Sequence, residues 1–262
     1  MSTGLGAAWR RSVPLAMAHR GQRATVPEQT LEAYQASIEL GCEAIECDVQ
    51  QTRDGRLVMM HDLTLERTTN GHGPVAAIDF DDLRRLDAGS WFDRRFAGIR
   101  VPTLEETIEL ALAADIPLCI EIKGTTVDAP RTAVAVAGLL RARDLLDRMF
   151  VSSFDHAALA AAAETAPGLL MAPERLPESG PPDPATAVAQ ATALGAAVLQ
   201  HRWEDLTTDV VDALHDAGVA VWAWPIDSDE AVAHSVAVGA DAVIGDDVAL
   251  LVRNLDRPAP RA

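Results

Sequence analysis

The sequence predicts a (β/α)8 TIM barrel with an insertion after its second strand. Eight short apolar segments alternate with segments of helical period along the chain. The length of 262 residues suits such a barrel, which takes about 250 residues. Polar residues stand at the ends of the first three predicted strands, where barrels of this kind carry their functional groups. We expect residues 1–262 to form a single domain, with a doubly wound open sheet as the alternative architecture.

Each predicted strand is a short apolar run bounded by turn residues. The predicted helices between them show apolar residues at helical spacing and typical start signals. The clearest signal is Thr103 followed by Glu106, a capping-box pattern. We expect the first 13 residues to form a loose arm. The eight strands begin near Leu15, Ala44, Ile116, Met149, Gly168, Ala196, Val219 and Asp241, and the helices cover 27–40, 103–114, 129–144, 155–165, 185–194, 207–217, 228–238 and the residues from 247.

The second strand continues into a hairpin and then into a long connection. Residues 45–62 run as strand, turn and strand, with the turn at Arg53-Asp54-Gly55. The link is too short for a parallel crossover, which needs roughly a dozen residues. Residues 62–100 are rich in turn residues, and a connection of this length is usually functional. We therefore expect a β-hairpin arm and an insertion at about 50–100. Trp91 and Phe92 should anchor it to the rest of the protein by packing, with substrate contact as the alternative.

Composition excludes several classes of partner. The net charge of −17 disfavours nucleic acid and anionic membranes, because both would be repelled. The three cysteines have no metal-ligand spacing. No apolar run reaches the roughly 18 residues of a membrane span, and no signal peptide is visible. We expect a cytoplasmic protein without stable membrane insertion, and its oligomeric state is left open.

Three carboxylates are candidates for one metal site. Glu46 and Asp48 lie two residues apart in the second predicted strand, so they share a face. Glu121 lies on the third strand, near the same end of the barrel. Hard oxygen ligands without cysteine favour one divalent cation, Mg²⁺ or Ca²⁺, over Zn²⁺.

Two histidines and two cations are placed near these carboxylates. His19 and Arg20 end the first strand, Lys123 shares a face with Glu121, and the hairpin returns His61 to a position opposite Glu46. Two imidazoles suit a general acid and a general base, while Arg and Lys suit phosphate. Together with a metal they fit hydrolysis or transfer at a phosphate ester. The remaining histidines outside the insertion are expected at solvated surface: His156, His201, His215 and His234.

The motifs across nearly the whole chain resemble the glycerophosphodiester phosphodiesterase family, whose barrel is related to phosphatidylinositol-specific phospholipases C. The resemblance implies that Glu46, Asp48 and Glu121 bind the metal, with the 62–100 insertion capping the pocket near the glycerol. It also implies that His19 and His61 are the acid–base pair and that Arg20 and Lys123 hold phosphate. The motifs are His19-Arg20-Gly21, Pro27-Glu28-Gln29-Thr30, Glu46-x-Asp48, Asp54-Gly55 to His61-Asp62, Arg67-Thr68-Thr69, Thr103-Leu104-Glu105-Glu106, Glu121-Ile122-Lys123 and Ser152-Ser153-Phe154.

Three motifs depart from the family pattern. Gln29 stands where the family has Asn, Pro225-Ile226-Asp227 follows Trp224 in place of Thr-Val-Asn, and Gly245 precedes Asp246 in place of Thr. We expect none of these motifs to touch the metal or histidine set. Glu28 either orients Arg20 or favours the start of the following helix through its charge. Trp224, near the rim, is a candidate substrate-binding residue, with packing alone as the alternative.

The resemblance implies a phosphoric diester hydrolase of glycerol and lipid metabolism. Its substrate would be a small glycerophosphodiester, cleaved to sn-glycerol 3-phosphate and an alcohol by general acid–base catalysis from the two histidines. Two alternatives stay open. One is a related lysophospholipase D-like phosphodiesterase or lyase. The other is a non-catalytic barrel that binds a phosphoester without turning it over.

Overall fold

Eight parallel strands form a nearly closed barrel in the computed structural model, which describes residues 5–177 and 183–256. The strands follow the order β6-β5-β4-β2-β1-β9-β8-β7, and β3 adds to β2 as an antiparallel arm. This confirms the predicted barrel. The strands are β1 (Leu15–His19), β2 (Ala44–Gln51), β3 (Leu57–Met59), β4 (Leu118–Ile122), β5 (Phe150–Ser152), β6 (Leu170–Met171), β7 (Val198–Arg202), β8 (Ala220–Ile226) and β9 (Ala242–Gly245).

The strand register aligns the polar strand ends. β1 pairs with β2 so that His19 lies beside Glu46, and β2 pairs with β4 so that Asp48 lies beside Glu121. Between β6 and β7 the barrel is closed by an isolated parallel bridge and by a backbone hydrogen bond of 3.0 Å from Ala197 to the Met171 carbonyl. Carboxyl ends of parallel strands point one way, so these polar groups share one mouth.

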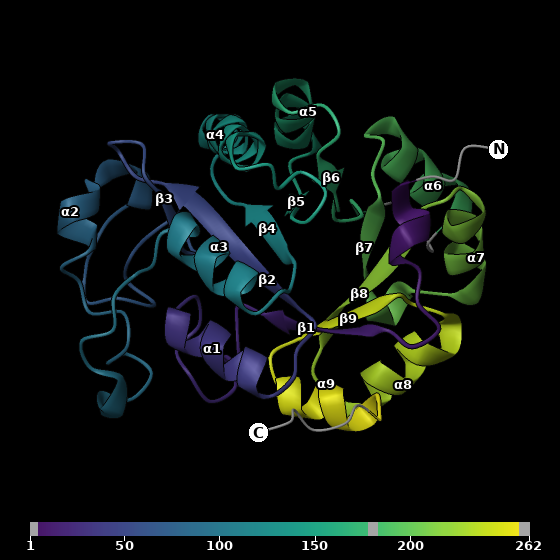
Figure 1. The fold of residues 1–262 in the computed structure, drawn as a ribbon, viewed down its shortest axis with the longest axis horizontal. Coiled ribbons are helices and arrows are strands. Elements are labelled where there is room, and N and C mark those ends of the chain that lie inside the picture. Colours follow the sequence, from purple (N-terminus) through teal and green to yellow (C-terminus); the bar gives the residue numbers. More distant parts are fainter. Residues whose placement is uncertain (1–4, 178–182, 257–262) are drawn as a thin grey trace.

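Helices surround the barrel, and Figure 1 shows them outside the strands. Side-chain caps start most of them, including the predicted capping box, in which Thr103 accepts from the Glu106 N–H and Glu106 accepts from the Thr103 N–H. The described helices are α1 (Leu31–Glu39), α2 (Phe80–Leu83), α3 (Leu104–Ala113), α4 (Asp128–Ala142), α5 (His156–Thr165), α6 (Pro184–Ala193), α7 (Thr208–Asp216), α8 (Asp229–Val238) and α9 (Val248–Asn254), with short 3-10 helices η1 (Leu5–Trp9), η2 (Val75–Ala77), η3 (Arg94–Phe96) and η4 (Trp203–Asp205). No helix in these described ranges is long and apolar enough to cross a membrane.

The interior of the barrel is a packed apolar core, distinct from the core between strands and helices. The Phe150 ring lies 4.7 Å from Trp222 and 4.6 Å from Trp9, edge to face in both pairs. Trp9 belongs to η1, so the prediction of a loose arm at residues 1–13 is wrong for this segment. Its indole supplies apolar contact area to the barrel core, and that contact orders the short helix.

The insertion lies beside the barrel (Figure 1). It has a hydrophobic cluster of its own. Strand alternation divides β3 between two clusters: Val58 faces the insertion, while Leu57 and Met59 face the core under the helices. Trp91 is 37% exposed and packs on Phe92 with ring centres 5.6 Å apart. The prediction that these two rings anchor the insertion to the barrel is therefore wrong.

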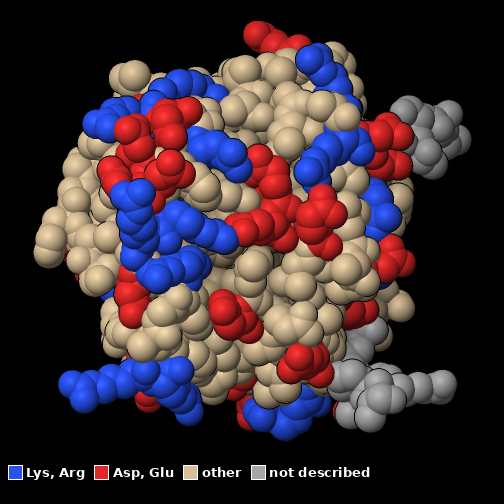
Figure 2. Space-filling model, turned by 60° about the vertical axis from the view of Figure 1, so that its left-hand side comes forward, with Lys and Arg blue, Asp and Glu red and all other residues tan. Residues whose placement is uncertain are grey.

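Ion pairs tie the insertion to the barrel instead. Arg84 donates to Glu106 of α3 at 2.7 Å, and Arg67 donates to Glu28 at 2.8 Å. Figure 2 turns this side forward and shows basic and acidic side chains interleaved across it. Guanidinium groups of the insertion therefore bind carboxylates of the barrel.

Candidate active site

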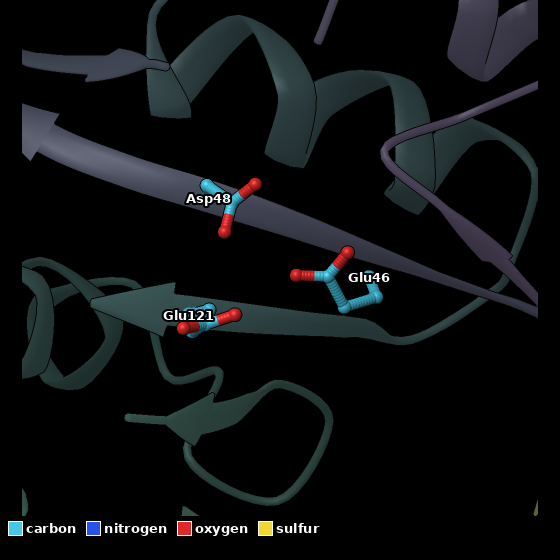
Figure 3. A group of neighbouring side chains, drawn as sticks. All are labelled: Glu46, Asp48 and Glu121. Carbon is cyan, nitrogen blue, oxygen red and sulfur yellow. The ribbon is translucent and has the colours of Figure 1, made fainter. Parts of the chain in front are cut away.

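Three carboxylates converge at the mouth of the barrel. Glu46 and Asp48 project from β2 and Glu121 from the neighbouring β4, and Figure 3 shows their oxygens directed toward a shared space. One oxygen from each lies within 4.8 Å of the other two. All three side chains are buried. Residues 73 positions apart in sequence are thus brought together by the parallel β2–β4 pairing.

Two cations offset part of the negative charge of this cluster. Lys123 Nζ lies 3.1 Å from Asp48 Oδ1 and also contacts Glu121, and Arg20 Nε lies 2.9 Å from Asp48 Oδ2. Burial raises the pKa of Asp48, but Lys123 and Arg20 outweigh it and lower this pKa to about 2. Burial and the nearby Asp48 charge raise the pKa of Glu121 to about 7. Burial, then Asp48, also raises the pKa of Glu46.

The donor set fits a hard divalent cation. Two oxygens on one such ion can be no further apart than twice a Ca²⁺–oxygen distance of about 2.5 Å, and the 4.8 Å spread of the three ligand atoms meets that limit. Both oxygens of Glu46 are buried and have no hydrogen-bond partner among the described residues. A buried carboxylate without partners costs free energy, which a bound cation would relieve.

His19 is held at the end of β1 by a carboxylate. Its Nδ1 lies 2.6 Å from Asp246 Oδ1, and its Nε2 lies 3.8 Å from Glu46 Oε2. Burial raises the pKa of Asp246, but His19 outweighs it and lowers this pKa. An ionised carboxylate only accepts, so Nδ1 carries the hydrogen and Nε2 is the basic nitrogen of the neutral ring. Burial lowers the pKa of His19, against the opposing effect of Asp246.

His61 is held in a similar way just after β3. Its Nδ1 lies 2.7 Å from Asp62 Oδ1, and Arg67 Nε donates to Asp62 Oδ2 at 2.7 Å. Burial lowers the pKa of His61, although Asp48 opposes that effect. The His61 side chain is 32% exposed, against 18% for His19. The two imidazoles therefore differ in their access to solvent.

One cavity of about 250 Å³ joins most of the predicted residues. Asp48 lies outside its lining and is fully buried. Trp224 lines the cavity, and its ring packs edge to face on Phe154 at 5.7 Å, so it is more than a core residue. The predicted residues that line the cavity are His19, Arg20, Glu46, His61, Glu121, Lys123 and Trp224.

Sequence reasoning assigned no site role to five residues that line this cavity: Phe154, Glu174, Gln200, Pro225 and Ile244. Glu174 follows β6, Gln200 lies in β7, and Phe154 lies just beyond β5. Glu174 is 3% exposed, and its Oε1 accepts a hydrogen bond of 3.2 Å from Gln200 Nε2. The signal was present, because each stands at or just after the end of a predicted strand.

All three motifs that depart from the family pattern reach the site. Pro225 lines the cavity, and the other two motifs contact the metal or histidine set, contrary to our prediction. Gln29 Nε2 donates to Asp48 Oδ2 at 2.5 Å, and Asp246 holds His19. Gln29 has a positive φ of 59° and precedes Thr30, the N-cap of α1, so its side chain turns inward and not along the helix. Glu28 also precedes the helix and accepts from Arg20 at 3.3 Å, as one of the two alternatives predicted.

The prediction of solvated surface for the later histidines is wrong. His201 is 3% exposed. His215 forms an ion pair of 2.8 Å with the buried Asp241, and His156 and His234 each bond a backbone carbonyl. Partly apolar imidazole rings pack readily under loops when a hydrogen-bond partner is in reach.

Comparisons with known proteins agree with this geometry. The model of the glycerophosphoryl diester phosphodiesterase family matches residues 19–250. A glycerophosphodiester phosphodiesterase of Caldanaerobacter subterraneus subsp. tengcongensis is 34% identical over 238 residues, which cover 91% of this chain and 96% of the relative. One from Bacillus altitudinis is 30% identical over 230 residues, covering 87% and 93%.

Solved structures show the same fold. A phosphodiesterase of Oleispira antarctica, in complex with the product sn-glycerol-3-phosphate, has a TM-score of 0.83 and 28% identity, covering 93% of this chain and 97% of that protein. A putative glycerophosphoryl diester phosphodiesterase of Silicibacter pomeroyi also has a TM-score of 0.83, with 26% identity and 97% coverage of both chains.

Proposed function

This chain belongs to the glycerophosphoryl diester phosphodiesterase family, and we propose that it hydrolyses glycerophosphodiesters to sn-glycerol 3-phosphate and an alcohol by acid–base catalysis between His19 and His61. The substrate is a small molecule, consistent with the product named for the Oleispira antarctica structure. Such a reaction belongs to glycerol and lipid metabolism, and we propose that it takes place in the cytoplasm.

The observation that carries the proposal is the matched setting of the two imidazoles. Each has its Nδ1 on a carboxylate, at 2.6 Å for His19 and 2.7 Å for His61, and both line one cavity. Each Nε2 is thereby left to exchange a proton with substrate. Arg20 and Lys123 line the same cavity and offer positive charge for the phosphate.

Glu46, Asp48 and Glu121 would hold one divalent cation, Mg²⁺ or Ca²⁺. When bound, the ion would supply positive charge toward developing negative charge on the phosphoryl oxygens. Lys123 and Arg20 pair with Asp48 and also line the cavity. These two cations would position the phosphate by direct hydrogen bonds.

The reaction proceeds in two proton-coupled steps. In the first, His19 takes the proton of the glycerol 2-hydroxyl as its oxygen attacks phosphorus, and His61 gives a proton to the departing alkoxide. In the second, His61 takes a proton from water, which opens the cyclic ester, and His19 returns its proton to the 2-oxygen. Direct attack of water on the diester is the variant, with the same pair of proton transfers.

The space around the two histidines supports the roles that we propose for them. A groove of about 760 Å³ opens beside the cavity, and His61 lines it while His19 does not. The departing alcohol has room there, so His61 is the acid in the first step and the more buried His19 is the base. Burial lowers the pKa of His19, which keeps its ring neutral near pH 7, as a base requires. Burial also lowers the pKa of His61, so this ring must take up a proton before the first step, and the Asp48 and Asp62 carboxylates favour that protonated form.

The rim of this groove favours a second candidate substrate class. Leu63 and Phe154 line it and are each 43% exposed. Apolar side chains at this position would contact an acyl chain on a lysophospholipid, as a lysophospholipase D-like enzyme requires. Comparing kcat/KM for glycerophosphocholine and lysophosphatidylcholine decides between the two classes, and a persistent cyclic phosphate product would identify a lyase.

A coupled assay for sn-glycerol 3-phosphate tests the proposal across a panel of diesters with Mg²⁺ or Ca²⁺. His19→Ala and His61→Ala should each lower kcat by about 10²–10⁴-fold, the usual contribution of a general acid or base. His72→Ala, an exposed histidine of the insertion, should retain full activity. Turnover unaffected by EDTA would refute the metal dependence, and full activity in either cavity variant would remove that histidine from the mechanism.

A further inference from the structure

Arg67 of the insertion binds two carboxylates that serve different parts of the site. Its Nε and Nη2 donate to Asp62 at 2.7 and 2.9 Å, and its Nη1 and Nη2 donate to Glu28 at 2.9 and 2.8 Å. Asp62 holds the Nδ1 of His61, while Glu28 accepts from Arg20. The Arg67 guanidinium therefore joins the carboxylate that holds His61 to the carboxylate that holds Arg20.

The same ion-pair chain continues to the other histidine. Arg23 lies 3.3 Å from Glu28 and 3.6 Å from Asp246, and Asp246 holds the Nδ1 of His19. Glu28 is 5% exposed and faces three guanidinium groups, so its ionised form is stabilised there. Burial raises the pKa of Glu28, but the Arg67 hydrogen bond and the neighbouring arginines outweigh it and lower this pKa.

We propose that Arg67 is a positioning residue that fixes His61 and Arg20 relative to each other, an inference that rests on the proposed function. The two groups come from different parts of the fold, His61 from the end of the hairpin arm and Arg20 from the first strand end. The Arg67 fork spans this boundary with four hydrogen bonds in fixed geometry. Without it, Asp62 keeps its contact with His61 but loses the group that orients its second oxygen.

The physical consequence is a change in geometry rather than in overall charge. A catalytic group displaced by about 1 Å can cost about 10²-fold in rate, and loss of an outer supporting group typically costs about 10–100-fold. A lysine at this position would keep the charge, but a single ammonium cannot reproduce the two paired sets of hydrogen bonds. We therefore expect activity to require the paired hydrogen bonds of the Arg67 guanidinium and not its charge alone.

The test compares Arg67→Met with Arg84→Met. Arg84 is a matched control because it also ties the insertion to the barrel by a paired contact, to Glu106, and is similarly exposed at 34% against 39%. We expect Arg67→Met to lower kcat/KM for glycerophosphocholine by about 10–100-fold, and Arg84→Met to change it by no more than about twofold. Arg67→Lys should recover little of the loss; full recovery would overturn the proposal.

A spectroscopic measurement separates positioning from a general loss of stability. The imidazole Nδ1–H resonance of His61, assigned by its absence in His61→Ala, should shift or broaden in Arg67→Met and stay unchanged in Arg84→Met. An unchanged His61 resonance in Arg67→Met would overturn the inference even if activity fell. The resonance measurement does not depend on turnover. A wild type that fails to hydrolyse diesters would refute the proposed function, whereas an unchanged resonance would refute only the role of Arg67.

A double-mutant cycle completes the test. If Arg67 acts through Asp62, the Arg67→Met/Asp62→Asn variant loses less activity than the product of the two single losses. Losses that multiply would show that the two residues act independently and would overturn the proposed path from Arg67 to His61.

Discussion

Glu174 illustrates what burial does to a single acidic side chain. It is 3% exposed at the end of β6, and burial, followed by the charge of Glu121, raises its pKa well above the usual value. Its Oε1 accepts a hydrogen bond from Gln200. A neutral carboxyl or an amide at this position could accept the same hydrogen bond. Glu174 thus adds a titratable acceptor to the cavity and lowers stability whenever it must ionise.

The variant Glu174→Gln should gain stability relative to the wild type as the pH rises. The pKa of Glu174 is higher in the folded than in the unfolded state. Its contribution to the free energy of unfolding is therefore present below the unfolded-state pKa and is lost at higher pH, whereas glutamine does not titrate. The difference in free energy of unfolding, measured with urea, should therefore grow from pH 5 to pH 8. The exposed Glu32→Gln is the control, and a difference that does not change with pH would contradict the assignment.

The residues at the ends of the first strands were predictable, because strand alternation and the barrel mouth together place them. The pairs His19–Glu46 and Asp48–Glu121 follow from parallel register. The partners Asp246 and Glu174 lie at the ends of later strands, to which we did not extend the same rule. Gln29 was not predictable in this way, since its contact with Asp48 depends on a positive φ just before a helix.

At the scale of elements, local signals fixed most boundaries. Helix α3 begins where the Thr103–Glu106 capping box predicts, and the β2–β3 hairpin turns at the predicted Asp-Gly. The short helix η1 escaped prediction because its order comes from the contact of Trp9 with Phe150, residues far apart in sequence. Tertiary packing of this kind leaves no periodic pattern in a short segment.

Removing the cap of α3 should weaken the fold and leave catalysis intact. Thr103→Ala deletes the acceptor for the Glu106 N–H, which typically costs about 1 kcal/mol. Urea unfolding should show this loss, with kcat unchanged because α3 begins away from the cavity. Thr192→Ala, whose exposed hydroxyl donates to the Val188 carbonyl of its own helix, is the control; equal losses in both variants would argue against a capping contribution.

At the scale of the whole molecule, the carboxylate cluster should couple metal binding to stability. A cation at 100 times its Kd stabilises a protein by about 2.7 kcal/mol, which is roughly 5–10 °C in Tm for a domain near this size. Adding Ca²⁺ or Mg²⁺ after EDTA treatment should produce such a shift, and Glu121→Gln should reduce it. An equal shift in Glu121→Gln would exclude this residue as a ligand.

The shift should depend on pH in a defined direction. Because the pKa of Glu121 is raised to about 7, its contribution to metal-free stability is lost as the pH rises through about 7. The cation requires the ionised carboxylate. The gain in Tm on adding the cation should therefore be larger at pH 8 than at pH 5.5, measured by thermal unfolding at both pH values.

The division of β3 between two clusters has a consequence for how this molecule can change. Val58 and Met60 are packed inside the insertion's own apolar interior, and His61 follows directly. Of the two histidines that we propose to transfer protons, His61 is therefore attached to the insertion and His19 to the barrel wall. Exchanging the insertion for one of different size, in evolution or by grafting, would also replace His61, Asp62 and Arg67. Substrate range and proton transfer would then be inherited as one module.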